Sequence, residues 1–113
     1  MPRSRSAAPR AIAGSAATFA ALGDETRLRL VSRLTGKGPL SITQLAHGLP
    51  ITRQAVTKHL RVMEVAGLVR SAPRGRERVW QLDDRRLALA RRHLDTISRE
   101  WDERLARLEK FVS

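Results

Sequence analysis

Residues 41–82 read SITQLAHGLPITRQAVTKHLRVMEVAGLVRSAPRGRERVWQL and contain two helix start signals in close succession. The first is the pair Ser41 and Gln44, which has the spacing of a capping box, so a short helix begins there. Gly48 ends that helix after little more than one turn. Thr52 then supplies an N-cap oxygen for a second helix that begins almost at once.

The second helix carries an apolar stripe and a clear end signal. Val56, Leu60 and Met63 follow one another at spacings of four and three residues, which is typical of a helix that buries one face. Gly67 suits the left-handed position that follows many helices. Two short helices joined by a tight turn containing glycine predict a helix-turn-helix over residues 41–66.

A basic hairpin pattern follows directly. Residues 68–72 and 77–82 have strand-like composition, and the turn between them contains Pro73 and Gly75. A two-stranded hairpin is unstable alone, so it must lean on the helices through apolar side chains, with either Val79 or Trp80 among them. The pattern predicts a wing over residues 68–82 behind the second helix.

The N-terminal third predicts a tail and two helices. Residues 1–10 contain three Arg, two Pro and two Ser, a composition typical of a disordered basic tail that can touch phosphates. The alanine-rich segment after the tail predicts a short helix whose large apolar residues are Phe19 and Leu22. Asp24 caps the next helix, which ends at Gly36.

Residues 84–112 predict one last helix, about 40 Å long at 1.5 Å per residue. Its apolar residues recur at spacings of three, four and seven and form a continuous seam. A single winged unit has few apolar faces left to cover such a seam, so we expect a homodimer, although packing on the chain's own core is an alternative. The predicted dimer interface consists of Phe19, Leu22, Leu94, Ile97, Trp101, Leu105 and Leu108.

These elements predict a mainly α protein with a small β-hairpin wing: a winged helix-turn-helix with a long C-terminal dimerisation helix. Residues 11–113 would form its single domain.

Charge favours a polyanionic partner. The chain of 113 residues has a formal charge of +11, and residues 53–78 hold seven basic side chains against two acidic ones. Binding a polyanion with such a surface releases counterions, which favours nucleic acid. The alternative is an arginine-rich solvated surface without a partner.

Composition also excludes several classes of protein. The chain has no cysteine, which rules out disulfides and thiolate metal sites. It has no apolar run of the roughly 18 residues that span a bilayer, and no apolar signal segment. We expect a soluble cytoplasmic protein without a membrane partner, located at the nucleoid when it is bound to DNA.

The polar face of the helix that follows Thr52 suits base recognition. Gln54, Thr57, Lys58 and Arg61 lie opposite the apolar stripe, and Arg53 occupies the exposed first turn. The N-terminal part of such a helix enters the major groove, where Arg pairs with guanine and Gln with adenine. Lys58 and Arg61 can instead hold phosphates. An ordinary amphipathic helix with a solvated face is the alternative.

The wing adds further cations that can reach DNA. Arg74 and Arg76 lie at its tip and Arg78 on the return strand, so they can reach the minor groove or the backbone. A surface turn kept soluble by its charge is the alternative.

The sequence resembles the ArsR/SmtB family of bacterial regulators. The matching stretches are FAALGDETRLRLVSRL, SITQLAHGL, TRQAVTKHLRVMEVAGLV and RGRERVWQL, all within residues 19–82. The resemblance implies a dimeric repressor whose first and last helices pair across a two-fold axis and which leaves its operator when a signal arrives. It also implies groove contacts by Arg53, Gln54, Thr57, Lys58 and His59. With Thr52 and the other cations, the predicted DNA-binding set is Thr52, Arg53, Gln54, Thr57, Lys58, His59, Arg61, Arg74, Arg76 and Arg78.

The chain departs from the metal sensors of that family. They often carry a Cys-x-Cys pair near the recognition helix, or Asp-x-His and His-x-x-Glu on the last helix. Here His47, His59 and His93 fall on three different helices and no cysteine is present. We therefore predict no metal site and no cofactor, and the chain resembles the subgroup with no known inducer.

Two other classes of function fit the sequence less well. A winged-helix module that binds protein rather than DNA need not place Arg53, Gln54 and Thr57 beside an arginine-rich wing. No nucleophile–base pair, Gly-rich phosphate loop or plausible pair of catalytic carboxylates is present, so we expect no enzyme. The sequence predicts a homodimeric repressor of duplex DNA with an inverted-repeat operator, its own promoter being one candidate.

Overall fold

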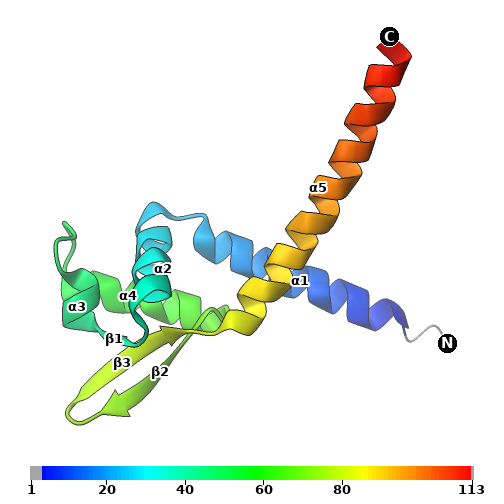
Figure 1. The fold of residues 1–113 in the computed structure, drawn as a ribbon. Helices are drawn as coiled ribbons and strands as arrows, with labels where there is room; N and C mark the ends of the chain where they lie inside the picture. Colours follow the sequence, from blue (N-terminus) through cyan, green and yellow to red (C-terminus); the bar gives the residue numbers. More distant parts are fainter. Residues whose placement is uncertain (1–3, 113) are drawn as a thin grey trace.

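The computed structural model describes residues 4–112 of the chain, most of them helical. Figure 1 shows a body made of short helices and a small sheet, from which the first and last helices project. In chain order the elements are α1 (Ser4–Leu22), α2 (Glu25–Lys37), β1 (Leu40–Ser41), α3 (Ile42–Ala46), α4 (Arg53–Val65), β2 (Val69–Arg74), β3 (Glu77–Leu82) and α5 (Asp84–Val112).

The predicted helix-turn-helix is confirmed, together with its caps. The Ser41 hydroxyl accepts from the Gln44 backbone N–H at 3.2 Å, and the Gln44 side chain accepts from the Ser41 N–H at 2.9 Å. The Thr52 hydroxyl accepts from the backbone N–H of Ala55 at 3.0 Å and so caps α4. These bonds satisfy backbone donors that the first turn of a helix would otherwise leave unpaired.

A Schellman turn ends α4 and starts the wing. Gly67 has a φ of 79°, in the left-handed region that favours glycine. The Leu68 N–H donates to the Met63 carbonyl at 2.9 Å, and the Gly67 N–H to the Glu64 carbonyl at 3.0 Å. The turn ends α4 and lets β2 begin at Val69, directly after it.

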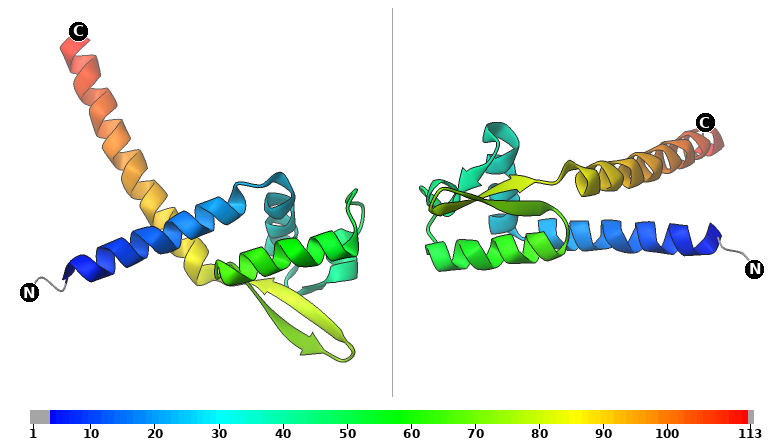
Figure 2. Two further views of the ribbon diagram at one scale, coloured as in Figure 1. Left: turned by 180° about the vertical axis from the view of Figure 1, so that it is seen from behind. Right: turned by 90° about the horizontal axis from the view of Figure 1, so that it is seen from below.

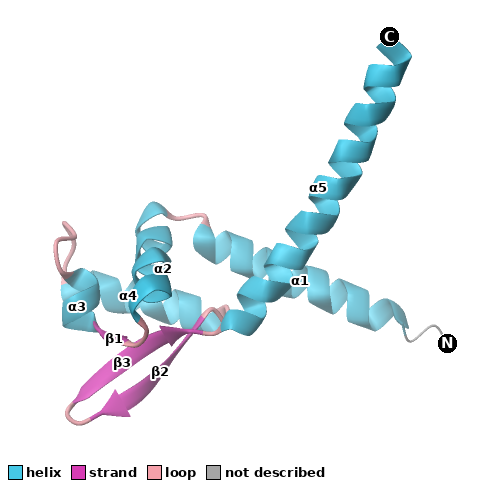
Figure 3. Cartoon of the chain, in the orientation of Figure 1, coloured by secondary structure: helices cyan, strands magenta, loops and turns pink. Residues whose placement is uncertain are grey.

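The sheet has three strands, one more than the sequence predicted. Figure 3 draws its strands in magenta. β3 lies in the centre and pairs antiparallel with β2 and with the two-residue strand β1, in which Leu40 lies opposite Trp80 and Ser41 opposite Val79. β1 escaped prediction because it has two residues, one of them the N-cap of α3, and it forms only through pairing with a strand far along the chain. Pairing with β3 anchors α3 to the base of the wing.

Both candidate wing anchors are buried, on opposite faces of β3. Trp80 is 2% exposed and belongs to the core, whereas Val79, 9% exposed, lies on the outer face beside Pro39 and Ala72. The core gathers the apolar faces of α2, α3, α4 and the sheet. Its fully buried side chains include Leu30, Leu45, Val56, Leu60, Met63 and Leu68.

The first helix starts earlier than predicted. α1 begins at Ser4, so residues 4–10 are helical where we expected a disordered tail, and residues 1–3 of that tail lie outside the described residues. Alanine is the strongest helix former, and alanines occur on both sides of the predicted boundary. Their helix propensity outweighs Pro9 and the charges on which the prediction rested, whereas Pro2 lies outside the described residues.

The last helix leans on α1 and then leaves the body. α5 spans 29 residues, and Ala90 is its one buried side chain. His93 Nδ1 lies 2.5 Å from the Ser15 hydroxyl of α1. Figure 2 shows α1 and α5 crossing there and diverging, so the second half of α5 stands in solvent.

Candidate nucleic-acid interface

The start of α4, the start of α3 and strand β3 border one cleft of about 290 Å³. The cleft brings Arg53, Gln54 and Thr57 of α4 together with Arg78 of β3, all four of which belong to the predicted DNA-binding set. Three polar residues outside the predicted set also line it, namely Ser41, Thr43 and Glu77. Thr43 lies two residues after the N-cap of α3, and Glu77 is the single acid of the wing. Their place in the cleft depends on the β1–β3 pairing.

The first turn of α4 presents free polar side chains. Arg53 and Gln54 are exposed, and their side chains make no hydrogen bond within residues 4–112. Thr57 differs, because its hydroxyl donates to the Arg53 carbonyl at 2.9 Å, and Thr52 uses its hydroxyl oxygen as the cap. Lys58 is exposed further along the helix, as is Arg61. Arg53 and Gln54 are therefore the side chains most free to pair with base edges.

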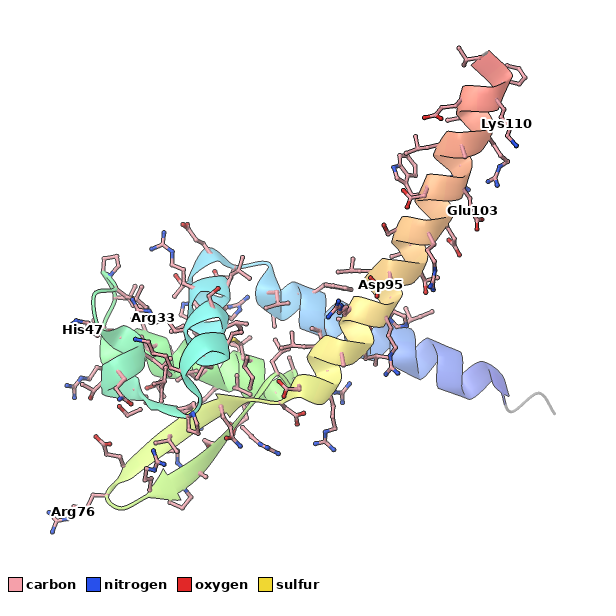
Figure 4. The ribbon with its side chains drawn as sticks, viewed as in Figure 1. Arg33, His47, Arg76, Asp95, Glu103 and Lys110 are labelled. Carbon is pink, nitrogen blue, oxygen red and sulfur yellow. The ribbon has the colours of Figure 1, made fainter. Side chains whose placement is uncertain are left out.

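The wing holds its arginines in two different ways. Arg78 donates to the Ser71 hydroxyl at 2.8 Å, and Ser71 donates to the Glu64 carboxylate at 3.4 Å, which ties Arg78 toward α4. Arg76 extends from the tip into solvent (Figure 4), where Gly75 makes the turn with a φ of 63°. Arg74 is exposed beside it. The base of the wing is held in place, and its tip offers unpaired cations.

His59 lies away from the cleft. Its side chain is 26% exposed, and its Nδ1 is 3.4 Å from Nη1 of Arg27 and 3.9 Å from Oδ2 of Asp24. Since 3.6 residues make a turn, His59 lies closer around the helix to the buried Val56 and Met63 than to Gln54. The sequence alone could therefore have indicated that His59 faces away from the groove. The structure thus separates His59 from the other predicted groove contacts.

Asp24 lies beside both Arg27 and His59. Its carboxylate accepts from the backbone N–H of Arg27 at 3.0 Å and caps α2. That hydrogen bond, with the charge of Arg27, lowers the pKa of Asp24 from its usual value of 3.8. The carboxylate therefore stays charged beside the arginine.

The predicted dimer face is apolar and uncovered in the single chain. Leu94, Ile97, Trp101, Leu105 and Leu108 are between 41% and 59% exposed. Phe19 is 36% exposed and lines a groove of about 390 Å³ between α1 and α5 together with Ile12 and Ile97. Leu22 differs from the other members of the set, because it packs partly against the core of its own chain.

The predicted absence of a metal site stays a prediction. Among residues 4–112 no three His, Cys, Asp or Glu side chains lie close enough together to hold a metal ion. No helix of that described part is long and apolar enough to span a membrane.

Comparison with known proteins places the fold and the function class. A family model described as a helix-turn-helix domain matches residues 22–72. The HTH-type transcriptional regulator Rv2034 of Mycobacterium tuberculosis is 48% identical over 75 residues, which are 66% of this chain and 69% of that protein. The uncharacterised HTH-type transcriptional regulator YuzN of Bacillus subtilis is 44% identical over 69 residues, 56% of this chain and 75% of that protein.

Solved structures agree with the curated relatives. An ArsR-like transcriptional regulator from Rhodococcus sp. RHA1 superposes with a TM-score of 0.73 at 40% identity, over 88% of this chain and 93% of that chain. These relatives are transcriptional regulators and not enzymes, and they confirm the predicted winged helix-turn-helix and its DNA-binding role. The chain belongs to the ArsR family of winged helix-turn-helix transcriptional regulators.

Proposed function

We propose that this DNA-binding regulator is a homodimeric repressor that recognises an inverted-repeat operator, with its own promoter as the first candidate. The observation that carries the proposal is the cleft in which Arg53 and Gln54 lie unpaired beside Arg78 and the basic wing. An interaction module that binds only proteins has no need of such a surface.

The side chains of α4 would divide between bases and phosphates. Arg53, Gln54 and Thr57 line the cleft and have the donors and acceptors that major-groove base edges match. Lys58 and Arg61 lie further along the helix and would hold phosphates. Arg74 and Arg76 would reach the minor groove or the adjacent backbone from the wing tip.

Dimerisation would explain the uncovered apolar face of α5. Burying apolar surface contributes about 25 cal/mol per Å², and the side chains of the seam from Leu94 to Leu108 remain between 41% and 59% exposed in the single chain. A second copy offers the same face, together with Phe19 of α1. The two α4 helices would then lie about one helical turn of DNA apart, roughly 34 Å, which requires an inverted repeat.

Repression follows from occupancy, since a dimer that covers a promoter excludes the polymerase. The signal that releases the dimer is left open, and we propose no metal or cofactor for it. The site of action would be the DNA in the cytoplasm.

A titration of the protein against three DNA probes tests this proposal. The probes are the upstream DNA of its own gene, an inverted repeat selected in vitro, and one isolated half-site. We expect one dimer to bind the inverted repeat at least about tenfold more tightly than the half-site, because two α4 helices engage together. Equal affinity for the inverted repeat and the isolated half-site, or binding of the inverted repeat by a single monomer, would contradict the proposal.

A further inference from the structure

One arginine joins three helices at the point where α1 enters the body. Arg27 of α2 donates from Nε to the Ala21 carbonyl in the last turn of α1 at 2.6 Å. Its Nη1 lies 3.4 Å from Nδ1 of His59, in the middle of α4. Its own backbone N–H is held by the Asp24 carboxylate at 3.0 Å. No other arginine in residues 14–112 makes hydrogen bonds to both α1 and α4.

The chemistry of the guanidinium makes this joint rigid. The donors of an arginine lie in one plane at fixed spacing, so a shift of one acceptor without the other would lengthen one of the two contacts. The Ala21 carbonyl lies at the end of α1, where the helix leaves carbonyls unpaired. Arg27 therefore satisfies that carbonyl and at the same time fixes its distance from His59.

The joint lies where small rotations have large effects. Ala21 is 4% exposed at the C-terminal end of α1, and the rest of that helix projects from the body (Figures 1 and 2). A change of angle between α1 and α4 would swing the groove-facing side chains of α4 relative to the dimer axis.

We propose that Arg27 and His59 are positioning residues, which hold α4 at a fixed angle to α1 and so set the distance between the two half-sites that the protein accepts. The inference rests on the proposed dimeric function. It assigns His59 the role of an acceptor for Arg27 in place of a contact to DNA. Nδ1 of His59 then carries no proton, since Arg27 has only donors to offer it.

Two substitutions at His59 distinguish its role as an acceptor for Arg27 from a role as a contact to DNA. His59→Leu removes the acceptor, whereas His59→Asn places Oδ1 where Nδ1 stood and keeps it. Arg27→Lys retains the charge but has a single nitrogen that cannot reach both acceptors. His47→Leu is the matched control, because the exposed ring of His47 makes no hydrogen bond within residues 4–112.

The measurement uses an inverted repeat selected in vitro by the wild-type protein. Affinities are measured for versions whose half-site spacing is one base pair longer or shorter, and for versions with single base changes within one half-site. We expect His59→Leu and Arg27→Lys to weaken the preference for the selected spacing about three- to tenfold. Base discrimination should stay near wild type in these two variants. His59→Asn and His47→Leu should keep both the spacing preference and the base discrimination of the wild type.

The double variant of Arg27→Lys with His59→Leu should lose no more spacing preference than either single variant, because both remove one joint. Loss of discrimination at a single base in His59→Leu, with the spacing preference intact, would overturn the proposal and make His59 a groove contact. Equal weakening on all probes by both His59 variants would overturn it in favour of a merely structural role. A wild-type protein with no spacing preference would instead overturn the proposed dimeric function, and this inference with it.

Discussion

Single side chains on α4 separate groove contacts from structural contacts. Gln54 and His59 are five residues apart on one helix, yet Gln54 opens into the cleft while His59 turns toward Arg27. Helical periodicity alone could have placed His59 near the apolar stripe. Its partner could not have been predicted, because Arg27 is 32 residues away in sequence and its direction depends on how α2 packs.

Gln54 should determine the identity of one base. Gln54→Ala is expected to relax discrimination at one operator position at a cost of about 1–3 kcal/mol there, because a bidentate pair with adenine is lost. Affinities for a set of singly substituted operators measure this effect, with Glu25→Ala, at the start of α2 and outside the cleft, as the control. Uniform weakening over all operators would show that Gln54 does not read a base.

Asp24 predicts a pH dependence of stability. Its lowered folded-state pKa means that the carboxylate stabilises the fold above pH 3.8, and that this contribution is lost as the pH falls through the folded-state value. Asp24→Asn keeps a capping side chain and removes the charge. The melting temperature of the wild type should exceed that of the variant at pH 7, and the difference should vanish in acid. A difference independent of pH would refute the assignment.

At the scale of elements, local signals predicted most of the fold. The capping box, the cap at Thr52 and the glycine after α4 act within a few residues, and each was found where the sequence placed it. Strand β1 was missed because it exists only through pairing with Trp80 and Val79 of a strand far along the chain. The role of Arg33 could not be predicted either, because its partner is also distant in sequence. Arg33 of α2 donates to the Leu45 carbonyl of α3 at 2.8 Å, and Figure 4 shows it beside His47.

The wing should contribute a phosphate contact from its tip. Arg76→Ala is expected to weaken binding to all sequences and to reduce the slope of log affinity against log salt by about one unit, since one fewer counterion is released. Titrations over a range of salt concentrations check this, and Glu77→Ala, which removes no cation, serves as the comparison. If Arg76→Ala leaves the salt slope unchanged, the tip makes no phosphate contact.

At the scale of the whole molecule, the chain separates two surfaces. The basic cleft lies on the body, and the apolar seam lies on the helices that leave it (Figure 1). The sequence predicted both surfaces because each depends on helical periodicity. It could not predict the cleft as a shape, because Thr43 and Arg78 meet there only through the three-stranded sheet.

A substitution at Trp101 tests whether the apolar seam of α5 forms the dimer interface. Trp101→Asp should produce monomers, because it would place an unpaired charge among buried apolar side chains of the dimer. Ala106→Asp introduces the same charge on nearly the opposite face of α5 and should leave the dimer intact. Sedimentation velocity distinguishes the two, and a stable dimer of Trp101→Asp would remove the seam from the interface.

Hydroxyl-radical footprinting of the wild-type protein on the upstream DNA of its own gene is the most direct measurement. A dimer with paired α4 helices predicts two symmetric protected patches on one face of the DNA, with centres about 10 base pairs apart and additional protection where the wings reach. A single short patch, or uniform protection without symmetry, would contradict a dimer that reads an inverted repeat.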